Sequence, residues 1–364
     1  MNTVDLYLQR ARALHERALV VDTHCDTTQR LKDPAWNFGL RDPRGHVDLP
    51  RLREGGVGAM FLAVWVPPAR QGADAVAAAR RQIRRIHETA ARYPDVVALA
   101  RSAPEVRRAK AGGRIALLVA IEGGHLIDDS LEVLREFRRD GATYLTLTHA
   151  LHTHWGDSSG VHEALAPLHG GLTAFGREVV RELNRLGMMV DVSHVSDATF
   201  FDVVETSRAP IVATHSSCRA VSPHRRNLTD EMMRAIAASG GVVQINFAAA
   251  FVDPGFPRLD PEVVEAYFAA GDFSRPVTDH RTPLELLVDH FDHALRTIGA
   301  DHVGIGSDFD GVPALPAGLE DCSKLPYLTA ALLRRGYAEE ELVKVLGGNV
   351  LRVMEACARV ADAA

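Results

Sequence analysis

The chain alternates short apolar runs with longer segments in which apolar positions recur at helical spacing. Eight of the runs have the length and the β-branched composition of buried strands. Most of them are followed by a segment long enough for a helix, an alternation typical of parallel βαβ units. Eight such units predict an α/β protein with a closed (β/α)8 TIM barrel. The predicted strands are residues 20–24, 57–66, 115–121, 144–148, 188–192, 211–214, 242–247 and 303–306.

The predicted helices fill the intervals between these strands. The longest covers residues 74–93, is basic on its outer face and has Asp74 as its expected N-cap. Residues 251–281 follow neither pattern and are interpreted as an insertion. No linker rich in Gly and Ser divides the chain, so residues 1–364 are expected to form one barrel domain with C-terminal helices. The other predicted helices are residues 6–17, 130–140, 174–186, 197–206, 230–238, 284–298, 327–335, 339–346 and 349–357.

The composition is that of a soluble globular protein, with 46% hydrophobic and 24% charged residues. A net charge of −6 argues against nucleic acid and anionic membranes as partners. The four cysteines fit neither a zinc ribbon nor a small disulfide scaffold, so we expect reduced thiols and a cytoplasmic protein. The longest apolar run is too short for a bilayer, which needs about 20 residues. The N-terminus lacks the pattern of a signal peptide and the C-terminus that of a lipid anchor, so no membrane anchor is expected.

Several predicted strands end in a residue that can bind metal or carry a proton. The carboxyl ends of parallel barrel strands meet on one face, where catalytic residues usually lie. His24 and Asp26 are two positions apart and therefore share a side of the first strand. Glu122 ends a buried strand, where a carboxylate must be paired, protonated or bound to metal. Two-metal hydrolases need an anionic bridge, and because no predicted strand contains a lysine, Glu122 is the natural candidate.

His194 and His215 end two consecutive strands of the predicted barrel. One such histidine is more often a satisfied core residue than a ligand, but two of them alongside His24, Asp26 and Glu122 favour a metal site. The sequence then predicts one site of His24, Asp26 and Glu122 and a second of Glu122, His194 and His215. Each keeps an open position for water, as catalytic zinc sites do. Two Zn²⁺ ions per chain, bridged by Glu122 and a water or hydroxide, are the expected cofactor.

Three further residues are candidates for catalysis and substrate binding. Asp308 is the expected general base, with Asp310 as a rival that more often caps or orients a loop. His149 ends the fourth predicted strand and could stabilise an oxyanion. Arg226 or its neighbour Arg225 could bind a substrate carboxylate, and spacing does not decide between them. The remaining histidines of the loop after His149 are expected to be structural or solvated: His152, His154, His162 and His169.

With these residues in these positions, the chain resembles the membrane dipeptidase (renal dipeptidase) family of the amidohydrolase superfamily. The similarity covers nearly the whole chain, in family order. The resemblance implies a barrel with a two-zinc site that hydrolyses dipeptides, with the five ligands named above. It also implies that His149 contacts substrate or transition state, that Asp308 handles the proton, and that Arg226 rather than Arg225 binds the carboxylate. The segments that carry it are VVDTHCDT, AIEGGH, YLTLTHA, FGREVVRELNRLGMMVDVSHVS, SRAPIVATHSSCRAVSPHRRNLTD, VVQINF, GIGSDFDGVPALPAGLEDCSKLP and GNVLRVMEA.

Three departures from the mammalian members stand out. Those enzymes are secreted, disulfide-bonded and lipid-anchored, so this chain is more similar to a soluble bacterial relative. They carry a tyrosine near the substrate where this chain has Ala248. Residues 251–281 match poorly, and a loop there could set specificity.

The expected activity is that of a zinc-dependent dipeptidase that hydrolyses the peptide bond of dipeptides; the sequence leaves open whether dipeptides of the L-Xaa-D-Xaa type are among them. An alternative keeps the two metals but makes the protein an amidase, a lactonase or a phosphotriesterase-like hydrolase, because fold does not fix function. A metal-stabilised barrel without activity is a third alternative, disfavoured by the full set of ligands. A homodimer is expected from the family alone.

Overall fold

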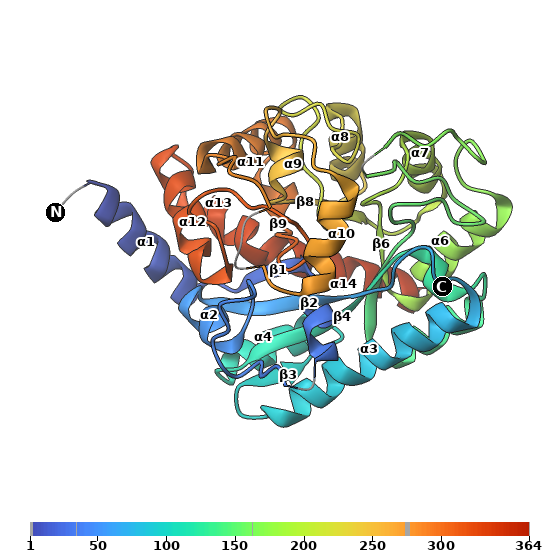
Figure 1. The fold of residues 1–364 in the computed structure, drawn as a ribbon, viewed down its shortest axis with the longest axis horizontal. Coiled ribbons are helices and arrows are strands. Elements are labelled where there is room, and N and C mark those ends of the chain that lie inside the picture. The colour runs from blue at the N-terminus through green and yellow to red at the C-terminus, as the bar shows by residue number, and fades with distance from the viewer. Residues whose placement is uncertain (1–2, 34, 162, 274–276, 364) are drawn as a thin grey trace.

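A closed barrel of eight parallel strands forms the centre of the molecule (Figure 1). The computed structural model describes residues 3–33, 35–161, 163–273 and 277–363. Neighbouring strands pair in the order β1-β2-β4-β5-β6-β7-β8-β9, and the pairing of β1 with β9 closes the ring. The predicted (β/α)8 TIM barrel is therefore confirmed. The strands are β1 Val20–Cys25, β2 Val57–Trp65, β3 Val97–Leu99, β4 Ile115–Glu122, β5 Ala142–Thr146, β6 Met189–Asp191, β7 Ile211–Ala213, β8 Val242–Ile245 and β9 Val303–Ile305.

Helices surround the barrel and cover the outer face of its strands. The C-terminal helix α14 packs against α6 and also reaches strands β6, β8 and β9. The α-helices are α1 Thr3–Arg17, α2 Leu49–Glu54, α3 Gly72–Arg92, α4 Ala103–Ala111, α5 Leu131–Arg139, α6 Ala174–Leu186, α7 Asp197–Thr206, α8 Asp230–Ala238, α9 Ala249–Val252, α10 Pro261–Ala270, α11 Leu284–Ile298, α12 Leu325–Arg334, α13 Glu339–Val343 and α14 Asn349–Asp362. Short helical turns lie at η1 Thr27–Lys32, η2 Gly124–Ile127, η3 Ala300–His302, η4 Cys322–Lys324 and η5 Lys344–Gly348.

Several elements differ from the sequence prediction. The ninth strand, β3, pairs with the first residues of β4 and was missed, as were the short helices α2 and α4. Asp74 is not an N-cap, because α3 begins at Gly72 and places Asp74 in the first turn. The predicted insertion, residues 251–281, contains the end of α9 and all of α10; its residues 274–276 lie outside the described part of the chain.

Strand β4 shows how the core is divided. Ala116, Leu118 and Ala120 share the face of Glu122 and belong to one apolar cluster with Phe61. The alternate residues of β4 belong to the larger cluster that includes the surrounding helices: Leu117, Val119 and Ile121. Every residue of β4 is buried, as expected for a parallel strand covered on both faces. This packing fixes the direction of the strand and therefore the place where Glu122 emerges.

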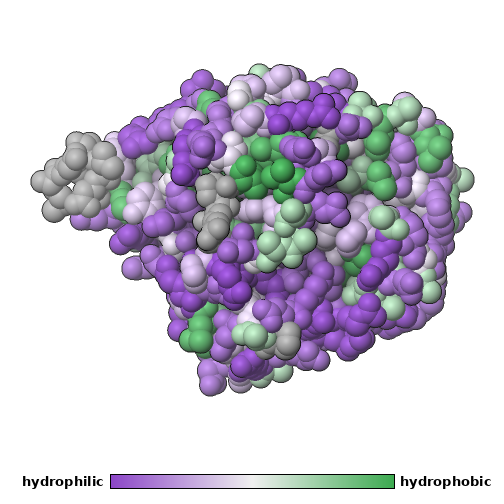
Figure 2. Space-filling model, viewed as in Figure 1, coloured by the Kyte–Doolittle hydropathy of each residue, from purple (hydrophilic) through white to green (hydrophobic). Residues whose placement is uncertain are grey.

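The surface seen in Figure 2 is mostly hydrophilic, with an apolar patch around α9 and α10. On α10, Val263 is 48% exposed and Phe268 is 38% exposed. Among the described residues, no helix combines the length and the apolar character needed to cross a membrane.

Candidate metal centre and active site

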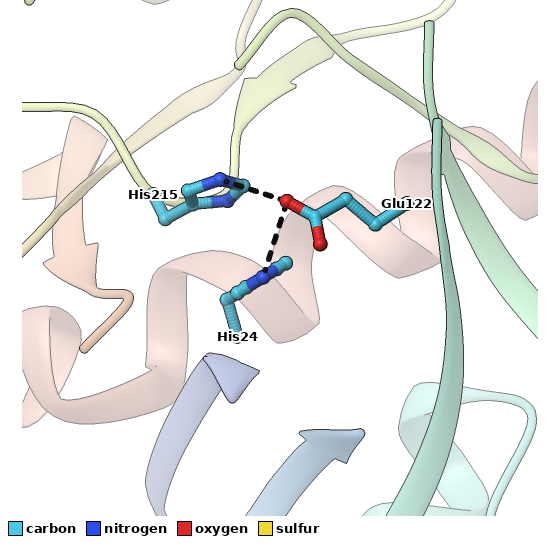
Figure 3. Close-up of side chains that lie close together, drawn as sticks. All are labelled: His24, Glu122 and His215. Carbon is cyan, nitrogen blue, oxygen red and sulfur yellow. Dashed lines mark ion pairs between the residues drawn. The ribbon is translucent and has the colours of Figure 1, made fainter. Parts of the chain in front are cut away.

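Four imidazole rings surround one oxygen of Glu122 at the carboxyl end of the barrel strands. Figure 3 shows two of them, with the rings of His24 and His215 both directed at the same oxygen of the Glu122 carboxylate. Glu122 is the last residue of β4 and is 3% exposed. The distances from its Oε1 atom to the imidazole Nε2 atoms are 3.2 Å for His194, 3.4 Å for His215, 3.5 Å for His24 and 3.7 Å for His149.

Two more carboxylates, those of Asp26 and Asp308, lie close to His24. Its Nε2 atom lies 3.6 Å from Asp26 Oδ2 and 4.0 Å from Asp308 Oδ1. Gly311 makes this approach possible, because a Cβ there would lie 2.1 Å from Asp26 Oδ2 and 2.5 Å from Asp308 Oδ1. Potential ligand atoms within 4.8 Å of one another form three groups: His24–Glu122–His215, Glu122–His149–His194 and His24–Asp26–Asp308.

The hydrogen bonds of His24 leave its inward nitrogen free for a cation. Its Nδ1 lies 2.8 Å from the hydroxyl of Tyr144, which itself donates to the carbonyl oxygen of Thr23 at 3.0 Å. The Tyr144 oxygen must therefore accept the Nδ1–H of His24. The Nε2 atom then faces the carboxylates and has no hydrogen-bond partner among the described residues, so a cation bound there would take the place of its proton.

A hydrogen-bond relay through a hydroxyl group also orients His215, as it does His24. Thr214 Oγ1 donates to Asp191 Oδ2 at 2.6 Å and lies 2.9 Å from His215 Nδ1, so it accepts the Nδ1–H. The Nε2 atom of His215 then presents a lone pair 2.9 Å from His194 Nε2. Such carboxylate-supported imidazoles are typical of metal sites, where the outer partner sets the tautomer of the ligand.

The electrostatics of the site also fit bound cations. Burial lowers the pKa of His149 to about 4 and lowers that of His215, so both rings stay neutral near pH 7. Burial and the nearby Glu122 carboxylate raise the pKa of Asp26 to about 8. Burial opposes a charge on His24, yet Glu122 and Asp26 raise its pKa well above the ordinary value. A buried cluster of carboxylates and neutral imidazoles that attracts positive charge is a suitable ligand set for zinc-like ions.

Three residues at this end of the barrel adopt a left-handed backbone conformation. The φ angles are 69° at His194, 65° at Asp308 and 63° at Asp310. This conformation is uncommon outside glycine but is enriched for Asn, Asp and His. It turns the chain sharply after β6 and β9 and brings the His194 and Asp308 side chains back over the strand ends.

Arg226 lies beside the cluster and is 3% exposed. Its guanidinium donates to the carbonyl oxygen of His215 at 3.1 Å and to Ser216 Oγ at 3.4 Å, while its Nε has no partner among the described residues. Phe251 covers one face, with its ring centre 5.4 Å away. Burial lowers the pKa of Arg226 to about 10, which still leaves it charged at neutral pH. A buried cation with a spare donor can bind a carboxylate.

The other candidates of the sequence analysis have structural contacts. Asp310 accepts from His46 N and from Thr27 Oγ1, both at 2.7 Å, and so ties two loops together. Arg225 is only half-buried. Among the loop histidines, His152 and His169 bond to backbone groups, His154 pairs with Asp129, and His162 lies outside the described residues.

The supporting residues Tyr144, Asp191 and Thr214 were not identified from the sequence. A hydroxyl or amide inside an apolar strand is only a weak signal, because such groups are often satisfied by the backbone. For Thr214 the available signal was its position directly before the strand-end histidine His215.

Comparison with known proteins identifies the family. A sequence profile described as Membrane dipeptidase (Peptidase family M19) matches residues 8–364. Dipeptidase verJ of Clonostachys rogersoniana is 39% identical over 378 residues, covering 99% of this chain and 89% of that protein. The chain belongs to the membrane dipeptidase family. Human Dipeptidase 3, another similar protein, is 37% identical over 360 residues, covering 97% of this chain and 68% of the human protein.

Solved structures agree with membership in the membrane dipeptidase family. The probable dipeptidase PvdM from Pseudomonas aeruginosa has a TM-score of 0.85 at 28% identity, covering 98% of this chain and 100% of that one. A metallo peptidase from Rhodobacter sphaeroides, liganded with a phosphinate mimic of the dipeptide L-Ala-D-Ala, has a TM-score of 0.82 at 31% identity. That alignment covers 93% of this chain and 99% of the neighbour. The resemblance inferred from the sequence is thus confirmed.

Proposed function

We propose that this protein is a zinc-dependent dipeptidase that accepts dipeptides with a D-residue at the C-terminal position. The observation that carries the proposal is the cluster around Glu122 Oε1, where four imidazole nitrogens lie within 3.2–3.7 Å in a member of a dipeptidase family. The phosphinate mimic of L-Ala-D-Ala bound by the Rhodobacter relative supports the substrate class.

His24, Asp26, Glu122, His194 and His215 would hold two zinc ions, with Glu122 shared between them. When bound, zinc supplies a water of lowered pKa, about 7, and polarises the scissile carbonyl. The unpartnered Nε2 of His24 and the fixed tautomer of His215 suit this role.

The remaining residues act on the substrate. Arg226 binds the C-terminal carboxylate through a buried guanidinium, which an uncharged ester would not use. His149 is neutral because burial lowers its pKa to about 4, and it donates a hydrogen bond to the oxyanion that develops from the carbonyl. Asp308 takes a proton from the attacking water and returns it to the leaving amine.

The test is a dipeptide library with zinc-loaded protein, in which L-Ala-L-Ala and L-Ala-D-Ala are compared with their C-terminal amides. We expect zinc-dependent hydrolysis of the free dipeptides and poor hydrolysis of the amides, because the amides lack the carboxylate for Arg226. In the Asp308→Asn variant we expect the zinc content to be retained and most turnover to be lost. Hydrolysis that is equal for amides and free acids, or full turnover of this variant, would contradict the proposal.

A further inference from the structure

Asn246 is a fully buried amide that the family resemblance did not single out. It follows strand β8 directly and is 0% exposed. Its Nδ2 atom donates to Asp308 Oδ2 at 2.9 Å and to the carbonyl oxygen of His215 at 3.4 Å. Its Oδ1 atom accepts from the backbone N–H of Ala248 at 2.5 Å. Both amide hydrogens and the amide oxygen are therefore in use.

The orientation of this amide is fixed by its own neighbours. The backbone N–H of Ala248 can only donate, so the Asn246 oxygen must face it. The NH₂ group then faces Asp308 and cannot turn away without breaking three hydrogen bonds.

The same amide joins Asp308 to Arg226. The carbonyl oxygen of His215 accepts from Asn246 Nδ2 and also from Arg226 Nη2, at 3.1 Å. A continuous chain of hydrogen bonds thus runs from the guanidinium through one carbonyl and one amide to Asp308 Oδ2. The other oxygen of Asp308, Oδ1, faces the metal cluster, 4.0 Å from His24 Nε2.

We propose that Asn246 is the positioning residue for Asp308: it holds Oδ2 so that Oδ1 faces the reacting bond at a fixed separation from Arg226. This inference rests on the proposed function. The terminal torsion of an aspartate is broad and two-fold, so the side chain alone does not select one orientation. Asn246 supplies that selection without contacting the substrate.

Two variants separate this role from general stability. Asn246→Asp keeps an oxygen for Ala248 N–H but replaces the donor to Asp308 by a second carboxylate. Asn246→Ala removes all three hydrogen bonds of the side-chain amide. In zinc-loaded protein we expect kcat of both variants to fall by about 100-fold, the loss that follows a misplacement of about 1 Å, while KM stays unchanged because Arg226 is intact.

Ser217→Ala is the matched control. Ser217 Oγ donates to the backbone carbonyl oxygen of Asn246 at 3.0 Å but not to Asp308. The kcat of this variant should match that of the wild type.

A double-mutant cycle with Asp308→Asn decides the mechanism. If Asn246 acts through Asp308, Asn246→Ala should cause no further loss of kcat in the Asp308→Asn background. An equal loss in both backgrounds, an unchanged kcat in both Asn246 variants, or a rise in KM without a fall in kcat would overturn the proposal. Full turnover of Asp308→Asn alone would instead show that the proposed function of Asp308 is wrong, so the two failures can be told apart.

Discussion

Thr214→Val removes one hydroxyl from the relay that orients His215 and keeps the shape of the side chain. Thr214 Oγ1 stands between His215 Nδ1, at 2.9 Å, and Asp191 Oδ2, at 2.6 Å. Without it, His215 loses the acceptor that holds the proton on Nδ1, and its Nε2 lone pair is no longer fixed towards Glu122.

The expected magnitude follows from this geometry. Loss of a partner that orients a metal-binding histidine weakens metal binding by about 10- to 100-fold. That factor corresponds to about 1.4–2.8 kcal/mol of binding free energy. The fold should survive, because Asp191 still accepts from Thr146 Oγ1 at 2.5 Å, from Thr214 N at 2.9 Å and from Ser193 N at 3.0 Å.

The assay is a zinc titration against a competing chelator, with the zinc content measured directly and the unfolding temperature as a check on the fold. Thr146→Val is the matched control, since it also removes a hydroxyl from Asp191 but none from His215. We expect weaker zinc binding in Thr214→Val and unchanged binding in Thr146→Val. Equal zinc affinity in all three proteins, or equal losses in both variants, would refute the idea that the relay acts through the histidine tautomer.

Two further predictions follow from buried contacts. Gly311→Ala would place a Cβ 2.1 Å from Asp26 Oδ2, so we expect a lower zinc content in a folded protein, and a wild-type zinc content would contradict this. His290 accepts from Cys218 N and contacts the Val252 carbonyl, each at 3.0 Å, and burial lowers its pKa to about 4. As the pH drops from 6.5 to 4, His290 takes up a proton in the unfolded chain before it does so in the folded protein, so the free energy of unfolding falls by about 3 kcal/mol. Denaturant unfolding of the His290→Gln variant should show a shallower decrease over this pH range. A decrease identical to that of the wild type would contradict the role given to His290.

The sequence pattern was sufficient to predict the barrel because each barrel strand can be recognised from its own short apolar run. The eight barrel strands are buried runs of three to nine residues at the positions predicted. Strand β3 was missed because three residues are too few to show a periodicity, and its pairing with β4 depends on the fold. The N-cap at Asp74 was wrong because α3 begins earlier, with Gln71 in an extended conformation as its cap.

For the candidate site, chain position indicated which side chains lie at the strand ends but not what supports them. The structure brings Glu122 together with His24, His149, His194 and His215, and their roles as ligands and catalysts stay predictions. The supporting contacts join residues that are distant in the chain. Tyr144 lies 120 positions from His24, and Asn246 lies 62 positions from Asp308. No spacing rule predicts such pairs, because they arise only when the barrel closes.

The left-handed residues at the rim limit how this protein can be altered. At His194, Asp308 and Asp310 any replacement must tolerate a positive φ as well as the loss of the side chain. Alanine scanning at these positions would mix a chemical defect with a conformational penalty, whereas asparagine tolerates the same backbone and isolates the chemistry. Variant libraries aimed at new substrates should therefore keep these three turns and diversify the neighbouring loops.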